Sequence, residues 1–299
     1  MNTAQLRAGA LCLTAVLMVA CGSPDPVAPE RYVDTDALMQ LMQDNLSGAD
    51  ALRKVADIDH SRLGHAAGSP MPPARVLMFS DPRLDTALLQ LNPLTGLDLP
   101  LRILAFEQAS DRSAKVIYNA FDYLVSRYRL DAKQTGALRQ SYAEAVATVT
   151  QGLPGDAFTA FDRDQMQPDG IITIRSPYGF ENTLGRVNAV IDSQSDAIRF
   201  GVVDFQANAR ELGIELPPAY LIFFGAPGPG GKAMASSPTL GLDAFCQKML
   251  VWQDAAGQTY LSFNDLHDLA ERQEAKKSLA LWVINFRLTS FFGDALAAK

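Results

Sequence analysis

The sequence predicts an α+β protein built from two duplicated domains that form a pseudo-dimer. The stretch at 72–108 returns at 217–254, and its repeated residues lie 145 positions apart. Ten residues share this offset: Pro72, Pro73, Ala74, Phe79, Pro82, Pro93, Gly96, Leu97, Asp98 and Gln108. Each copy combines short β-branched and aromatic runs, which are typical of buried strands, with longer stretches at helical spacing. A constant offset over this length is typical of a duplicated unit.

The N-terminal segment is expected to be a signal peptide, at 1–20. Arg7 is followed by an uncharged, mostly apolar run that is too short to span a bilayer. Cys21 comes directly after a small residue, which resembles the lipobox of bacterial lipoproteins, where the cysteine is acylated. Gly22 then resembles the lipoproteins that are sent on to the outer membrane. The alternative is a plain secreted protein in which Cys21 is a free thiol. Residues 21–33 are polar and proline-rich and are expected to form a tether.

Composition and charge favour an ordinary globular protein without nucleic-acid partners. The chain has 299 residues, 48% hydrophobic and 20% charged, which is enough for two cores. Removal of 1–20 deletes one of the 26 basic residues and none of the 33 acidic ones, so the net charge changes from −7 to −8. Such an acidic surface repels phosphate backbones. Only Cys21 and Cys246 then remain, so acylation of Cys21 would leave no disulfide.

The first domain is expected at 34–150. Pro82 should end the first of its strands, because proline cannot donate to a ladder. Its expected strands are 76–79, 101–106 and 115–118, and its expected helices are 36–55 and 131–151. The turn Gly96-Leu97-Asp98 joins two of the strands.

The second domain is expected at 170–299, after a glycine- and aspartate-rich linker at 151–169. Its expected strands are 171–174, 220–224, 248–252 and 259–263, and its expected helices are 180–191 and 278–296. The counterpart of the strand 171–174 would be 26–30, whose two prolines exclude a central strand, so the first domain either lacks this strand or forms it out of register near Tyr32-Val33. The first domain therefore has an exposed sheet edge, which the tandem partner could cover.

The last expected helix, 278–296, is apolar on almost every side. A helix of this kind is normally buried on every side. We expect domain one to cover its far side, through the helix 131–151 or the incomplete sheet edge. The alternatives are a homodimer seam and a lipid-facing surface.

The repeated stretch also resembles a known family. The residues that carry the resemblance are Asp59-His60, Pro72-Pro73, Phe79, Asn92-Pro93, Gly96 to Leu101 and Tyr118-Asn119, with Asp204, Pro217-Pro218, Phe224, Gly241 to Asp243 and Phe263-Asn264 in the second copy. Their order resembles domain-of-unknown-function family 302. The resemblance implies a TATA-binding-protein-like β-α-β-β-β-β-α unit in each copy, and it brings no established activity.

Two groups of residues are candidates for chemistry. Asp59 and His60, with His65 nearby, could form an acid–base pair or part of a metal site, although zinc needs three or four converging ligands. The alternative is structural: Asp59 caps a turn and His60 bonds backbone. The repeated Gly96, Asp98, Gly241 and Asp243 are expected to be structural, with glycine at positive φ and aspartate bonding backbone amides.

The sequence supports three hypotheses for function. The first is a lipoprotein on the periplasmic face of the cell envelope, anchored through Cys21, that binds an apolar ligand or an envelope protein without catalysis. The second is an enzyme or metal site that uses Asp59 and His60. The third is a structural envelope protein. No cofactor is indicated, because the phosphate-binding, nucleophile and metal motifs do not occur.

Overall fold

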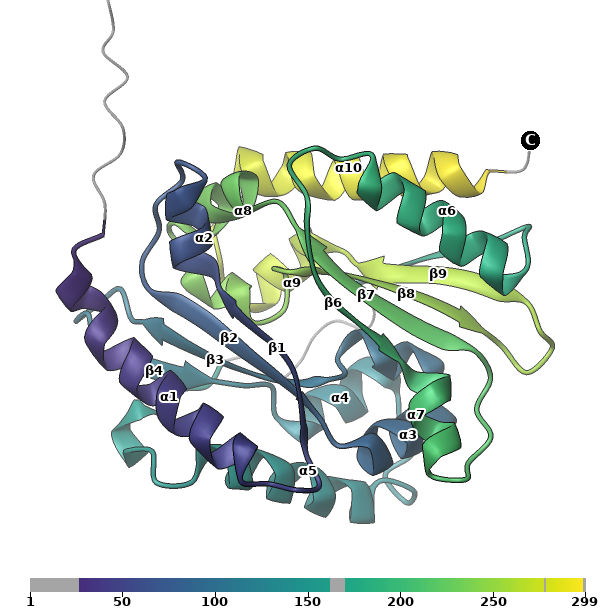
Figure 1. Cartoon of the computed structure of the whole chain (residues 1–299), viewed down its shortest axis with the longest axis horizontal. Coiled ribbons are helices and arrows are strands. Elements are labelled where there is room, and N and C mark those ends of the chain that lie inside the picture. Colours follow the sequence, from purple (N-terminus) through teal and green to yellow (C-terminus); the bar gives the residue numbers. More distant parts are fainter. Residues whose placement is uncertain (1–26, 162–169, 277, 298–299) are drawn as a thin grey trace, which may run out of the picture.

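The computed structural model describes residues 27–161, 170–276 and 278–297. The expected signal peptide and residues 21–26 of the expected tether, Cys21 included, lie outside these residues, as do 162–169 of the linker. Figure 1 shows two antiparallel sheets side by side, with the edge strands β1 (Arg53–Asp59) and β6 (Ile198–Asp204) adjacent. Each sheet is covered on its outer face by long helices of its own repeat.

The first repeat contains a four-stranded sheet of order β1-β2-β3-β4. Its remaining strands are β2 (Ala74–Ser80), β3 (Leu101–Glu107) and β4 (Ala114–Ile117). Its helices are η1 (Pro29–Tyr32), α1 (Val33–Ser47), α2 (His60–Ala66), α3 (Pro82–Leu91), η2 (Pro93–Leu97), α4 (Phe121–Tyr128) and α5 (Gly136–Thr150). The last residues of the expected tether therefore form η1.

The second repeat contains a five-stranded sheet of order β5-β9-β8-β7-β6. Its remaining strands are β5 (Ile171–Arg175), β7 (Ala219–Gly225), β8 (Gln247–Gln253) and β9 (Thr259–Asn264). Its helices are α6 (Phe180–Asp192), α7 (Phe205–Glu211), α8 (Pro227–Met234), η4 (Pro238–Gly241), α9 (Leu266–Arg272) and α10 (Leu279–Leu296), and the short η3 (Gly155–Ala157) precedes the repeat. The order of strands and long helices confirms the predicted duplicated α+β fold.

Local differences from the prediction have identifiable causes. Residues 53–55 were expected in a helix but begin β1, because the helical spacing of apolar residues ends near Leu46. Pro82 and Pro227 do end their strands, and each also begins a helix at its first position. A missing N–H is harmless there, and the fixed φ of proline suits the helix.

The strand register shows that the repeat offset changes by one residue. Ala74 pairs with Phe106, whereas its counterpart Ala219 pairs with Trp252. The offset is therefore 145 in β2 and β7 but 146 in β3 and β8. Arg102 in β3 consequently corresponds to Lys248 in β8.

From residue 27 onward, the first repeat has no strand that corresponds to β5, as expected, and the linker covers the open edge. Val116 of β4 forms a parallel bridge with Phe158, and Thr159 donates its N–H to the Val116 carbonyl at 3.0 Å. Lys115 Nζ donates to the carbonyl of Asp156 at 2.7 Å. The cover was expected from the tandem partner, and it comes from the segment that joins the repeats.

The two repeats interlock through the two corresponding turns that contain Gly96 and Gly241. The turn η2 packs on β7, β8 and β9 of the second sheet, and η4 packs on β2 and β3 of the first. A Cβ on Gly96 would lie 3.0 Å from Leu250 Cδ1, and one on Gly241 would lie 2.8 Å from His60 Cδ2. Positive φ was expected at both glycines and is found at neither. Glycine is needed because the other repeat leaves no room for a side chain.

We predict that Gly241→Ala destabilises the protein by about 1–3 kcal/mol, because the new Cβ would overlap the buried ring of His60. The matched control is Gly185→Ala within α6, where nothing lies within 4 Å of the added Cβ. This control should stabilise the chain by about 0.5–1 kcal/mol. Urea unfolding measures both changes, and an unchanged midpoint for Gly241→Ala would contradict the interlocking arrangement.

Candidate functional site

Asp59 and His60 lie side by side in sequence but do not bond each other. Asp59 is the N-cap of α2 and accepts from the backbone N–H of Arg62 at 2.8 Å. His60 is buried and donates from Nε2 to the carbonyl of Gly241 at 3.1 Å, in the other repeat. Burial lowers the pKa of His60 to about 4, although the bond to Gly241 and the charge of Asp59 oppose this change. His60 is therefore neutral near pH 7 and works as an interface residue.

The other expected metal ligands do not converge with it. His65 is exposed on α2, and Asp57 forms an ion pair with Arg75 at 2.6 Å. Within the described residues, no group of three or more His, Cys, Asp or Glu side chains could hold a metal ion. A cavity beside His60 also contacts Cys246, but its volume of about 20 Å³ suits one water molecule. Burial raises the pKa of the Cys246 thiol to about 12, which makes it a poor nucleophile.

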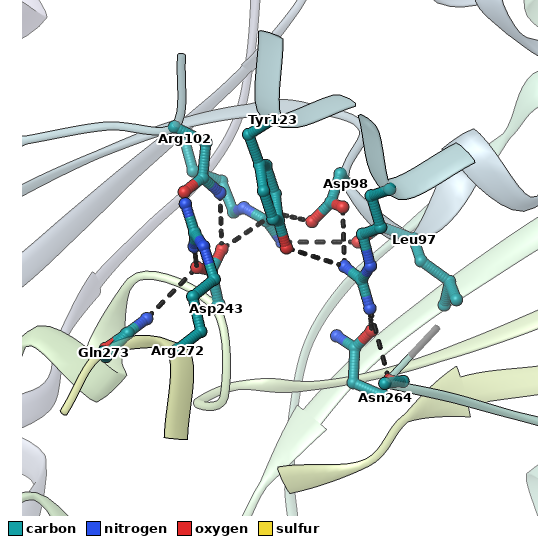
Figure 2. Close-up of polar contacts among 12 residues, drawn as sticks. Leu97, Asp98, Arg102, Tyr123, Asp243, Asn264, Arg272 and Gln273 are labelled. Atoms are coloured by element: carbon teal, nitrogen blue, oxygen red, sulfur yellow. Dashed lines mark hydrogen bonds and ion pairs between the residues drawn. The ribbon is translucent and has the colours of Figure 1, made fainter. Parts of the chain in front are cut away.

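A buried charge cluster lies where the two interlocking turns meet, and Asp98 and Asp243 are at its centre (Figure 2). Asp98 accepts from Arg127 at 2.6 Å and from the hydroxyl of Tyr128 at 2.7 Å. Arg127 also donates to Asn264 of the second repeat at 2.7 Å. Burial alone would raise the pKa of Asp98, but Arg127 and Arg102 hold it at about 2. This carboxylate is therefore ionised at every physiological pH.

The second half of the charge cluster repeats the first with the roles of the repeats exchanged. Asp243 accepts from Arg272 at 3.1 Å and from Gln273 at 3.1 Å. Asn119 of the first repeat donates to Asp243 at 2.9 Å. Four pairs in the cluster, including Asp98 with Asp243, lie 145 residues apart: Arg127 with Arg272, Tyr128 with Gln273, and Asn119 with Asn264. Each pair of aspartate and arginine therefore has an asparagine of the other repeat as a further partner: Asn264 binds Arg127, and Asn119 binds Asp243.

Arg102 joins the two halves. Its Nη2 lies 2.6 Å from Asp98 and 3.2 Å from Asp243, and the side chain is 2% exposed. Arg272 stacks on Tyr123 of the first repeat, with its Cζ 3.7 Å from the ring centroid. The charge cluster therefore binds the repeats to each other through ion pairs, hydrogen bonds and a cation–π contact.

The structure corrects the expected role of Asp98 and Asp243. Both follow the turns as predicted, but their carboxylates bind arginine and amide side chains instead of backbone amides. The sequence reasoning missed Arg102, Arg127 and Arg272. The signal for two of them was present, because Arg127 and Arg272 share the offset of 145.

We predict that Asp243→Asn destabilises the protein by about 3–5 kcal/mol, because it leaves Arg102 and Arg272 buried with too little negative charge. The control is Asp122→Asn, which breaks the exposed pair with Arg139 and should cost at most about 1 kcal/mol. Chemical denaturation compares the two, and equal costs would contradict the importance of the buried cluster.

Asp85 on α3 is a further buried carboxyl, and no arginine faces it in the described contacts. It is 1% exposed and accepts from the hydroxyl of Ser80. Burial raises its pKa to about 8, despite that hydrogen bond. The unfolded carboxyl ionises near 3.8, so between the two values the folded chain holds a proton that the unfolded chain has released. Stability due to Asp85 therefore falls as the pH rises through this window.

We predict that the protein loses stability between pH 6.5 and 8, by roughly 1.4 kcal/mol per pH unit at most. Below pH 6.5, down to about 4, the buried neutral His60 has the opposite effect, since the unfolded histidine gains a proton there. Asp85→Asn should remove the loss of stability between pH 6.5 and 8, whereas the exposed control Asp44→Asn should leave that loss unchanged. Unfolding midpoints across pH measure this, and a slope that survives Asp85→Asn would refute it.

The outer face of α10 is the third feature, and here the sequence expectation was wrong. Domain one does not cover this helix, which packs on α6, α8, α9 and β5 of its own repeat. Four residues at spacings of three and four form the exposed α10 face: Leu279, Trp282, Val283 and Phe286, with exposures of 77%, 53%, 39% and 58%. Trp282 and Phe286 stack with ring centroids 5.6 Å apart. Among the described helices, α10 meets the length and composition of a membrane span, a test that core helices also pass.

These features define a class: a tandem α+β protein whose two repeats interlock around a buried charge cluster. A family model described as "Domain of unknown function DUF302" matches residues 30–149 and 172–283. The chain belongs to this family, as the resemblance implied.

Individual relatives match shorter parts of the chain. The chain is 38% identical over 103 residues to "Fluoride-specific ion channel FluC 1" of Brucella suis biovar 1 and to the protein of the same name from Brucella abortus biovar 1. These matches cover 34% of this chain and 40% and 37% of the relatives, so the chain spans about two fifths of their length. A crystal structure of an uncharacterized DUF302 protein from Bacillus stearothermophilus is similar at a TM-score of 0.36 and 16% identity, covering 42% of this chain and 98% of that one.

Proposed function

We propose that this protein is a non-catalytic docking module of the bacterial cell envelope. Lipid on Cys21 anchors it at the periplasmic face, and the α10 face binds the surface of a lipid bilayer. The observation that carries the proposal is the exposure of Leu279, Trp282 and Phe286 on one side of a folded helix. The opposite side of α10 is firmly held, since Phe292 is buried between Phe224 and Phe263. The helix therefore presents its apolar face without leaving its repeat.

The chemistry of the α10 face suits the membrane interface. Tryptophan and phenylalanine favour the region between headgroups and acyl chains, where an amphipathic helix lies in the plane of the bilayer. With lipid on Cys21, the chain up to Val27 spans roughly 20 Å at most, so the folded part stays close to the bilayer. Two relatives that match 34% of this chain are named as ion channels, which accords with a place beside a membrane.

The acidic net charge determines which force can attract the protein to the bilayer. Without residues 1–20 the chain has 25 basic and 33 acidic residues, a net charge of −8, and is repelled by anionic headgroups, so attraction must come from apolar burial. Binding through the α10 face should therefore persist at high salt, which screens charge but does not weaken apolar burial.

We predict that residues 22–299, which carry the whole described fold without lipid, co-sediment with phosphatidylcholine vesicles in low salt and in 0.5 M NaCl. The double variant Trp282→Ser and Phe286→Ser should bind at least about tenfold more weakly, because it removes two large apolar side chains from the contact. The control Val202→Ser changes a residue on β6 that is 48% exposed and should bind like the wild type.

Absence of vesicle binding, or equal binding by the double variant, would overturn the bilayer assignment. A wild-type dimer that the double variant converts to a monomer, without vesicle binding, would assign the α10 face to a second copy instead. In cells, Cys21→Ala should shift the protein only partly from membranes to the periplasm. Adding the double substitution should complete the release. If Cys21→Ala changes nothing, the lipid anchor is refuted.

A further inference from the structure

Lys248 is a buried lysine that the charge cluster does not pair. Its side chain is 2% exposed. Its Nζ has no hydrogen-bond partner among the residues that the structure describes. A buried polar side chain without a partner is unusual, and a buried ammonium is especially costly.

The register places Lys248 at the edge of the charge cluster. It is the counterpart of Arg102, which joins Asp98 and Asp243 in the first repeat. Leu250, two residues further along β8, contacts the turn at Gly96, so this side of β8 faces the first repeat. Extending the β8–β9 register by two residues places Lys248 opposite Asn264, which binds Arg127. Lys248 therefore lies on the same face as the cluster and next to one of its members.

Among the residues that the structure describes, the charges of this region do not balance. Arg102, Arg127 and Arg272 face only Asp98 and Asp243 in the cluster, which leaves one excess positive charge before Lys248 is added. The Nε groups of all three arginines are also buried without partners among the described residues. Uncompensated charge in a dry interface strongly opposes folding. The interface therefore combines excess positive charge with four unused donors.

We propose that a small monovalent inorganic anion of halide size binds beside Lys248 at the interface of the two repeats. The ammonium of lysine ends closer to its strand than the guanidinium of Arg102 does. The anion would take the position that the end of the guanidinium fills in the first repeat. Its charge would offset that of Lys248, and the unused Nε–H groups of the cluster would be its further donors.

The test compares residues 22–299 with Lys248→Met in sodium fluoride, chloride and gluconate at equal ionic strength. The wild-type unfolding midpoint should rise by about 2–8 °C, saturably, in fluoride or chloride relative to the large anion gluconate. Lys248→Met should show no such rise. The exposed control Lys232→Met on α8 should behave like the wild type. Chloride-35 NMR line broadening should report binding to the wild type and to Lys232→Met alone.

A second variant keeps the proposal testable if Lys248→Met does not fold. Lys248→Arg recreates the guanidinium of the first repeat, so it should fold and lose the anion dependence. The proposal is overturned if the wild type shows no preference for small anions, which would mean a neutral lysine or a bound water. It is equally overturned if Lys248→Arg keeps the wild-type response.

Discussion

The pairing of charges in a dry interface is the constraint on which the rest of this structure depends. Asp98, Asp243 and Arg102 are each at most 5% exposed. Arg102 and Asp243 have partners in both repeats, and Asp98 is linked to the second repeat through Arg102 and Arg127. A slipped or rotated arrangement would leave ionised groups without partners, at several kcal/mol each. Buried ion pairs often contribute little net stability compared with apolar residues of the same shape. Their main effect here is therefore to permit only one relative placement of the two repeats.

That constraint explains why the repeated turns are so similar. Asp98 and Asp243 directly follow Gly96-Leu97 and Gly241-Leu242, so each carboxylate reaches the cluster only if its turn is fully inserted into the other repeat. Full insertion excludes any Cβ at the glycine. Steric fit and charge pairing therefore specify the same relative placement of the repeats. A turn that is not fully inserted would also leave its aspartate without its partners. Such agreement between independent requirements is expected of a sequence that encodes one structure.

The sequence was sufficient for the parts of the fold that depend on local pattern. Apolar runs located most strands, the offset revealed the duplication, and two prolines revealed the missing strand. The charge cluster could not be predicted, because it joins residues far apart in the sequence: Arg127 and Asn264 are 137 residues apart, and Asn119 and Asp243 are 124 apart. A Gly-Leu-Asp sequence has the same local pattern whether its aspartate bonds an amide or an arginine. The prediction of what covers α10 was wrong for another reason. Apolar composition indicates that a helix face avoids water, but it does not identify what covers that face.

The differences between the repeats are more informative about function than their similarities. The shared residues, such as Asp98 with Asp243 and Arg127 with Arg272, are fully occupied in holding the repeats together. The last helix of the first repeat, α5, has polar Gln140 and Glu144 on its exposed side, whereas α10 has Trp282 and Phe286 at its surface. In the interface, Arg102 forms ion pairs with Asp98 and Asp243, whereas the Nζ of its counterpart Lys248 has no partner among the described residues. Both departures from symmetry lie in the second repeat. The first repeat and the shared residues hold the second repeat in place, so the remaining positions of the second repeat are free to diverge. A membrane-binding surface and an anion site, as proposed above, are features that this divergence allows.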